Sequence, residues 1–229
     1  MRVNGKRPPP TGVFIDPQTD RITVHGKAVK PVTRHRYILL NKPLGVITTA
    51  KDQVSRTTVL DVVGDEGKGG HRLFPVGRLD ADTSGLLLLT DDGDLAFRLT
   101  HPGYKVSKEY VALVAGNPST ADIDKLRNGV ELDDGLTAPA EVDVLRITPG
   151  SRDSGVAEIR IVIREGRHRQ VRRMLHFTGH KVQSLKRVGF GPLKLGRLKV
   201  GGWRVLGEAE ITALQRAVET KKDQLKRPK

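Results

Sequence analysis

Two polar segments of the chain carry side chains that could do chemistry. The first is the stretch 77–85, GRLDADTSG, which joins two apolar segments predicted to be strands. A long turn so rich in Asp, Thr, Ser and Gly can hold a carboxylate against a cleft. An aspartate in such a turn more often bonds to its own backbone. Spacing alone therefore favours a local, structural role for both Asp80 and Asp82.

The second segment is basic and begins a predicted helix. Residues 165–173 read EGRHRQVRR, and helical spacing of apolar residues extends over 167–178. Cations at a helix N-terminus oppose the helix dipole and cost about 0.3–1 kcal/mol each, so a helix that is merely solvated gains nothing from them. Free N–H groups and guanidinium groups can instead converge on a phosphate or carboxylate. The segment therefore predicts an anion-binding site, with Arg169 and Arg173 as phosphate contacts.

The charge of the whole chain agrees with a polyanionic partner. Its 229 residues include 40 Lys and Arg against 26 Asp and Glu, a formal net charge of +14. Residues 159–204 hold thirteen of these cations and a single acid, Glu165, whereas residues 122–134 are mostly acidic. A basic protein with an unrelated role has no need to gather its charge in this way. Clustering on this scale indicates a nucleic-acid footprint.

Composition excludes several classes of protein. The absence of cysteine excludes disulfides, thiolate zinc sites, iron–sulfur clusters and a cysteine nucleophile. His176 and His180 stand four apart, but Gly179 is expected to end the helix between them and no third ligand is evident, so no metal site is expected. Apolar runs such as 86–89 are far shorter than the ~20 residues that span a bilayer. The first ten residues, MRVNGKRPPP, do not resemble a signal peptide, so a cytoplasmic protein without a membrane partner is expected.

The elements that would position these residues predict an α+β fold with a mainly antiparallel sheet, because many short strands have few helices between them. Alternation places Lys108 and Tyr110 on one face of a strand over 108–114. The other expected elements are strands at 37–40, 86–90 and 157–163 and helices at 118–130, 167–178 and 211–219.

Four segments, in this order along the chain, resemble the RsuA/RluB/RluE/RluF family of ribosomal RNA pseudouridine synthases. They are NKPLG (41–45), GRLD with TSGLLLLT (77–80 and 83–90), KEY (108–110) and EGRHRQVRRM (165–174). The second is the strongest, because it resembles the catalytic-aspartate motif of that family. The resemblance covers about residues 37–206. It implies the pseudouridine synthase fold, a mixed, mainly antiparallel sheet with flanking helices and a central RNA-binding cleft.

The resemblance also assigns roles to individual residues. Asp80 would be the catalytic carboxylate, Tyr110 the aromatic side chain that packs on the target base, and Arg172 the basic partner of Asp80. By itself, a tyrosine in a strand is more often plain packing. The further residues expected to bind substrate are Asn41, Lys42, Arg78, Lys108, Arg167, Arg169, Val171 and Arg173.

The implied reaction converts uridine to pseudouridine after the base has left its stack. Uracil is detached from C1′ and rejoined through C5, so neither a cofactor nor a metal is expected. The residues leave the route open: Asp80 attacks C1′, attacks C6 of the base, or assists cleavage and deprotonation at C2′. The expected substrate is ribosomal RNA, with 23S favoured over 16S, free or in a pre-ribosomal particle, and the protein is expected to be a monomer.

Three parts are expected along the chain: a small β-rich segment 1–33, a catalytic domain 34–213 and a charged helix and tail 214–229. Residues 2–30 resemble only the second half of an S4 RNA-binding domain, so either the chain starts late or this module has degenerated. An alternative function is an RNA-binding or ribosome-assembly factor on the same scaffold without turnover. A general S4-type RNA-binding protein is a weaker alternative.

Overall fold

The computed structural model describes residues 1–16, 19–29, 34–148 and 155–219. The chain divides into two compact units, Met1–His35 and Arg36–Lys229. Within the described residues of the small unit, β1 pairs with β2 and β2 with β3 in an antiparallel sheet. These strands are β1 (Arg2–Val3), β2 (Ile22–Val24) and β3 (Lys27–Val29). The tail expected beyond residue 219 lies outside the described residues.

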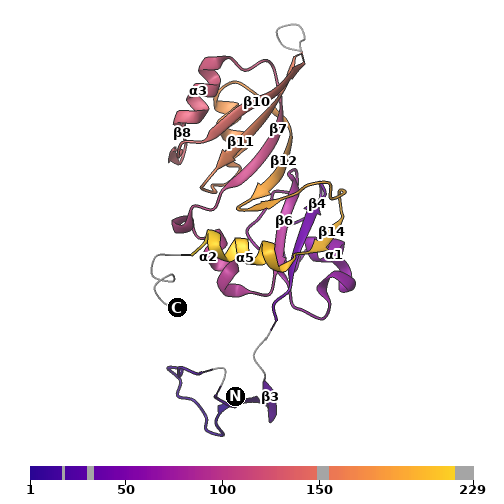
Figure 1. The fold of residues 1–229 in the computed structure, drawn as a ribbon, viewed down its shortest axis with the longest axis vertical. Coiled ribbons are helices and arrows are strands. Elements are labelled where there is room, and N and C mark those ends of the chain that lie inside the picture. Colours follow the sequence, from indigo (N-terminus) through magenta and orange to yellow (C-terminus); the bar gives the residue numbers. More distant parts are fainter. Residues whose placement is uncertain (17–18, 30–33, 149–154, 220–229) are drawn as a thin grey trace. The chain divides into compact units, whose positions relative to one another are not determined.

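The larger unit is built on a mixed sheet, which is nine-stranded in the described part of the chain. Its main path runs β10–β11–β7–β12–β6–β4–β14, and β13 and β5 pair with β12 and β6 (Figure 1). The β12–β6 pair is parallel and the other pairs described in this sheet are antiparallel. The predicted α+β fold with a mainly antiparallel sheet is therefore confirmed.

The sheet strands are β4 (Tyr37–Lys42), β5 (Phe74–Pro75), β6 (Ser84–Thr90), β7 (Lys108–Ala115), β10 (Glu141–Thr148), β11 (Val156–Ile163), β12 (Val182–Phe190), β13 (Leu193–Lys194) and β14 (Trp203–Val205). A separate hairpin joins β8 (Glu131–Leu132) to β9 (Gly135–Leu136). The helices are α1 (Val59–Lys68), α2 (Gly93–Thr100), α3 (Thr120–Asn128), α4 (Gln170–Phe177) and α5 (Glu208–Ala217), with a short 3-10 helix at Pro102–Tyr104.

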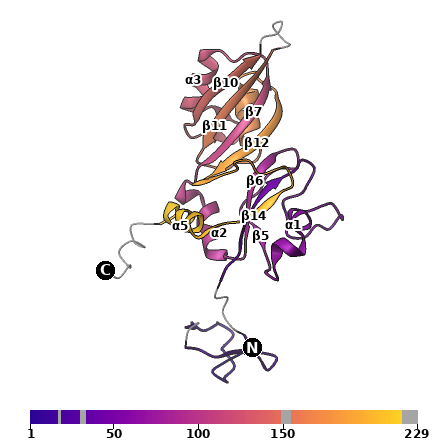
Figure 2. The same cartoon turned by 45° about the vertical axis from the view of Figure 1, so that its right-hand side comes forward.

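Helices cover both faces of the sheet. Successive side chains of a strand point to opposite faces, and in β4 Ile38 and Leu40 belong to one core cluster whereas Tyr37 and Leu39 belong to the other. Helices α1, α3 and α4 contribute to the first cluster, and α2 and α5 to the second. In Figures 1 and 2, α2 and α5 lie together on one side of the sheet and α1 on the other. This double coverage explains why β4 and β6 are apolar throughout rather than alternating.

Helix α4 begins at Gln170, three residues later than the spacing predicts. Arg169, which precedes it, has φ 48° and ψ 32°, in the left-handed region. The backbone N–H of Arg167 donates to the side-chain oxygen of Gln170 (3.0 Å), which ties the preceding loop to the first residue of the helix. Residues 167–169 are therefore a loop, and their cations do not occupy the first turn of the helix.

The expected boundary between residues 213 and 214 falls inside α5, so that division is wrong. Leu214 is fully buried and Val218 nearly so, because the apolar side of α5 packs into the second core cluster. Within the described parts of the chain, no helix combines the length and the apolar character needed to cross a membrane.

Candidate active site

A cavity of about 270 Å³ opens beside the turn that follows β5. Its wall combines four stretches that are far apart in the sequence, residues 76–83, 99–110, 163–171 and 185–190. Seven residues expected from the sequence to act on substrate line it: Arg78, Asp80, Lys108, Tyr110, Arg167, Arg169 and Val171. The volume is close to the lower end of small-molecule sites, about 300 Å³.

The turn that carries Asp80 is held from behind by the segment after β4. The Gly45 N–H donates to the Ala81 carbonyl (2.8 Å). The Thr48 hydroxyl donates to the Leu79 carbonyl (2.7 Å) and accepts from the Leu79 N–H (3.3 Å). Within the turn, the Thr83 N–H closes back on the Asp80 carbonyl (3.0 Å). The backbone at Asp80 is therefore fixed without use of its carboxylate.

Lys42 is another support of the same turn. Its side chain is fully buried, and Nζ donates to the carbonyls of Pro43 and Thr83, each at 2.9 Å. Burial lowers the pKa of Lys42 to about 8, although the charges of Asp80 and Asp82 act to raise it. The prediction that Lys42 binds substrate is wrong, because the strand that carries it is covered on both faces.

Asn41 is equally removed from the cavity. It is 1% exposed, and its side-chain amide donates to the Leu198 carbonyl (2.8 Å). Its backbone bonds to Gly201 and Gly202. The predicted contact of Asn41 with substrate is therefore wrong as well. The residue ties β4 to the loop before β14.

Replacement of Lys42 by Met is expected to slow turnover without weakening RNA binding. The variant leaves two buried carbonyls without a donor and loosens the turn, and a small misplacement of a reacting group can reduce the rate about 10²-fold. The dissociation constant for RNA is expected to change less than about twofold, because Lys42 has no surface to offer RNA. Single-turnover assays and filter binding on the same RNA separate the two effects. A parallel loss of affinity would contradict this supporting role.

Asp82 joins two arginines of the basic segment to the turn. Arg169 donates to both carboxylate oxygens of Asp82 (3.1 and 2.8 Å). Arg172 donates to the Asp82 carbonyl (2.6 Å), and its Nη2 lies 3.4 Å from the Asp82 carboxylate. The hydrogen bonds from Arg169 and the charge of Arg172 lower the pKa of Asp82, against a smaller opposing effect of burial.

The predicted pairing of Arg172 with Asp80 is therefore corrected. Among the described residues, the cation within 4 Å of Asp80 is Arg169, with Nη1 3.6 Å from Oδ2. Arg172 lies behind it and outside the cavity lining, where burial lowers its pKa. Sequence spacing favoured a local role for Asp82, and nothing local in the sequence could connect it to partners about ninety residues away.

Arg173 and Arg167 hold the β8–β9 hairpin. Arg173 donates to both carboxylate oxygens of Asp134 (3.1 and 2.8 Å) and Arg167 to one of them (3.1 Å). These hydrogen bonds, that of Arg173 first, lower the pKa of Asp134 to about 2. Arg167 also donates to the carbonyls of Gly135 and Leu136 (2.7 and 2.5 Å).

These ion pairs join Asp134, at the end of the acidic segment 122–134, to two cations of the basic segment 165–173. Arg173 does not line the cavity, and its guanidinium is engaged by a carboxylate. Arg173 therefore holds the hairpin through an ion pair, and its expected contact with phosphate stays a prediction. Arg167 lines the cavity as well as holding the hairpin.

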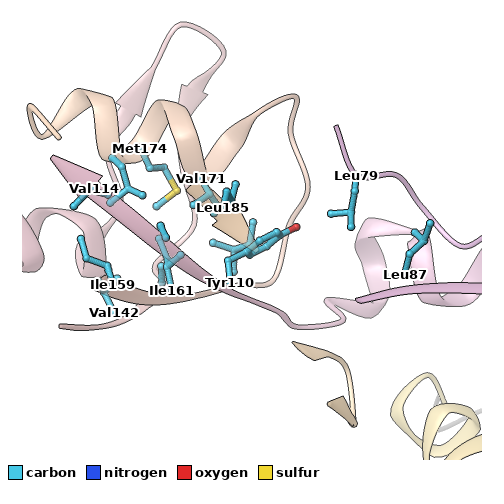
Figure 3. Close-up of a cluster of buried hydrophobic side chains, with 14 of the residues drawn as sticks. Leu79, Leu87, Tyr110, Val114, Val142, Ile159, Ile161, Val171, Met174 and Leu185 are labelled. Carbon is cyan, nitrogen blue, oxygen red and sulfur yellow. The ribbon is translucent and has the colours of Figure 1, made fainter. Parts of the chain in front are cut away.

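Tyr110 forms an apolar part of the cavity wall. It is 8% exposed and belongs to the first core cluster, together with Val171 and Leu185. Figure 3 shows its ring at the end of this cluster, with the hydroxyl directed toward the side where Leu79 lies. The predicted face of the strand is confirmed, because Lys108 and Tyr110 both line the cavity.

Lys108 and Arg187 are cations of the inner wall. Lys108 donates to the Val106 carbonyl (3.2 Å). Burial first, and then the charge of Arg187, lower the pKa of Lys108 to about 8, with Glu165 opposing. Arg187 is one of the thirteen cations of residues 159–204. No local pattern singles it out, because a buried arginine and a solvated one have the same sequence neighbours. Among the described residues, no group of three or more histidine, aspartate or glutamate side chains could hold a metal ion.

This fold and this cavity, in which a carboxylate on a fixed turn faces a strand tyrosine among arginines and lysines, define a protein that acts on RNA. Residues 36–177 match the RNA pseudouridylate synthase family. The chain belongs to this family. It is an RNA pseudouridine synthase, an isomerase.

Known relatives cover nearly the whole chain. It is 42% identical over 218 residues to the ribosomal large subunit pseudouridine synthase B of Bacillus subtilis (strain 168). The match covers 94% of this chain and 85% of that protein. It is 40% identical over 222 residues to an uncharacterized RNA pseudouridine synthase of Aquifex aeolicus (strain VF5), with 96% and 86% covered. A crystal structure of a pseudouridylate synthase matches with a TM-score of 0.69 at 30% identity, over 93% of this chain and 87% of that one.

Proposed function

We propose that this chain converts a uridine of 23S ribosomal RNA to pseudouridine, with Asp80 as the catalytic carboxylate. The observation that carries the proposal is the position of Asp80, which lies on a rigid turn at a nucleoside-sized cavity and faces it together with Tyr110. The similarity to a large subunit enzyme of Bacillus subtilis favours 23S RNA over 16S RNA and the RsuA/RluB/RluE/RluF group within the family.

The cavity can receive a base that has left its stack. Unstacking a uridine costs a few kcal/mol, and packing against an aromatic ring offsets this by about 1–3 kcal/mol. Tyr110 supplies that ring and Val171 the neighbouring apolar contact. Arg78 is exposed and lines the cavity, and its proposed role is to bind a phosphate of the RNA backbone.

Asp80 acts on the bound uridine in its ionised form. The C1′–N1 bond breaks with its electron pair going to N1, and C5 then bonds to C1′. The C5 proton leaves and N1 takes up a proton, which completes the isomerisation. Asp80 serves this sequence by adding to C1′ or C6 or by accepting the C2′ proton. Arg169 is the nearest cation to Asp80 in the part of the chain that the structure describes, and Asp82 holds its guanidinium in place.

RNA binding is expected to weaken as pH rises, because of Lys108. Its pKa of about 8 means that it loses most of its charge between about pH 7 and pH 8.5. The sign follows from charge: the protonated lysine attracts phosphate and the neutral one does not. Because about two-thirds of one charge is lost, the slope of log affinity against log salt is expected to become shallower by about 0.5 over this interval. In the Lys108→Arg variant the slope should stay constant, and an equal change in both proteins would assign the effect to another group.

The proposal is tested in ribosomal RNA from cells with and without this protein. Carbodiimide modification followed by primer extension maps each pseudouridine. The purified chain is then added to [5-³H]uridine-labelled ribosomal RNA from the cells that lack it, and tritium release is measured. One 23S position that disappears without the protein and is restored by it supports the proposal. A missing 16S position would move the substrate to the small subunit, and no release from either RNA would end the assignment.

The unit Met1–His35 is proposed to assist docking to RNA. Its three short strands suit the half S4-like module suggested by the sequence. The protein is proposed to act as a monomer in the cytoplasm, on free ribosomal RNA or on a pre-ribosomal particle.

A further inference from the structure

Arg187, on β12, is a buried cation in the wall of the cavity. It is 2% exposed. Its Nε donates to the Leu86 carbonyl (2.8 Å), and its guanidinium lies over the Phe190 ring, 5.2 Å from the centroid. Its Nη2 is buried and has no hydrogen-bond partner among the described residues. One face of the guanidinium therefore packs on Phe190 and Nε is bonded to the backbone, while Nη2 is left without a partner.

The sheet places Arg187 next to Tyr110. The two residues are direct partners in the antiparallel β12–β7 pair, and directly opposed residues project to the same face of a sheet. On its other side Arg187 is paired with Gly85, which has no side chain to cover it. A base that packs on Tyr110 therefore lies beside the guanidinium of Arg187.

A guanidinium buried with a free donor is unfavourable for folding. Arginine keeps its charge in proteins, and a buried polar group without a partner loses its hydration without compensation. Such a group is retained where a ligand completes its bonds. The burial of Arg187 indicates which ligand this is. The flat edge of a base can reach Nη2, whereas a phosphate would bind first to Arg78 or Arg169, which are more exposed.

We propose that Arg187 binds the target uracil through a ring carbonyl and stabilises the negative charge that the ring carries while it is detached. This inference rests on the proposed pseudouridine synthase reaction. When C1′–N1 breaks, the electron pair passes to N1 and is delocalised onto O2 and O4. A preorganised donor at one of these oxygens lowers the barrier. The charge disappears again when C5 bonds to C1′. The C5 proton then leaves and N1 takes up a proton, so the product ring is neutral.

The test compares Arg187→Met and Arg187→Lys with wild type in single-turnover tritium release from [5-³H]uridine-labelled ribosomal RNA, at saturating enzyme. Arg187→Met keeps an unbranched stem over Phe190 and removes the donors and the charge. Its rate is expected to fall about 10²- to 10³-fold, while the Kd for the RNA, by filter binding, changes less than about twofold. Its Tm is expected to change little, because the lost bond to the Leu86 carbonyl is offset by removal of a buried charge with an unsatisfied donor. Arg187→Lys should recover part of the rate.

Arg204→Met is the matched control, because Arg204 is a strand arginine paired with Glu210 and lies outside the cavity lining. It should lower Tm and leave the rate unchanged. Wild-type turnover in Arg187→Met would overturn the inference alone. A raised Kd with a shallower salt dependence would show that Arg187 contacts phosphate and would overturn the inference. If Arg187→Met and Arg187→Lys both lose rate and Tm to the same extent as each other, Arg187 is structural and the inference is again overturned. If wild type releases no tritium, the inference fails together with the proposed function.

Discussion

Asp80→Asn is expected to abolish pseudouridine formation and to leave the fold intact. Asparagine has nearly the same shape as aspartate but is neither a nucleophile nor a base at neutral pH, and loss of such a group reduces turnover by at least about 10⁴-fold. The fold does not depend on the carboxylate. The Asp80 side chain is 38% exposed, and backbone contacts from Gly45 and Thr48 hold its turn. Tritium release measures the activity and thermal unfolding measures the stability.

Asp94→Asn is the control for this substitution. Asp94 stands in the first turn of α2, away from the cavity lining, so the same chemical change should leave activity at the wild-type level. Turnover by Asp80→Asn within tenfold of wild type would refute the assigned role. A large fall in its Tm would instead show that the carboxylate supports the fold.

Gly85→Ala is expected to cause the largest loss of stability of any single methyl group added in this region. Gly85 has φ +105°, and a Cβ there would lie 2.2 Å from the Arg187 carbonyl oxygen. Neither strand can move apart easily to make room for the methyl group, because β6 and β12 are hydrogen-bonded to each other at this position. A strained backbone together with overpacking of a core is expected to lower the free energy of unfolding by about 3–5 kcal/mol. Urea unfolding followed by circular dichroism measures the difference.

Gly196→Ala separates the two causes. Gly196 has φ +59°, but a Cβ there meets nothing within 4 Å, so only the left-handed backbone is penalised, by about 1–2 kcal/mol. If Gly85→Ala is no more destabilising than Gly196→Ala, the close approach of β6 and β12 does not restrict position 85. Residual folded Gly85→Ala protein should also turn over slowly, since Arg187 and the Asp80 turn meet at this junction.

The local structure and the class of reaction follow from the sequence. Alternation over 108–114 predicts the strand of Tyr110 and the face it uses, because a side-chain period of two requires no knowledge of neighbours. The start of α4 was predicted too early for a tertiary reason. The bonds of Arg167 to Asp134 and to the hairpin carbonyls hold residues 167–169 outside the helix.

Which charged groups meet depends on the long-range packing of the chain. Asp82 reaches Arg169 and Arg172 across about ninety residues, and the buried positions of Lys42 and Arg187 depend on strands that join the sheet from different parts of the chain. A lysine or arginine has the same local pattern whether it faces water or a sealed cavity. Its role is set by sheet order and by what covers each face, and those are long-range properties that periodicity does not contain.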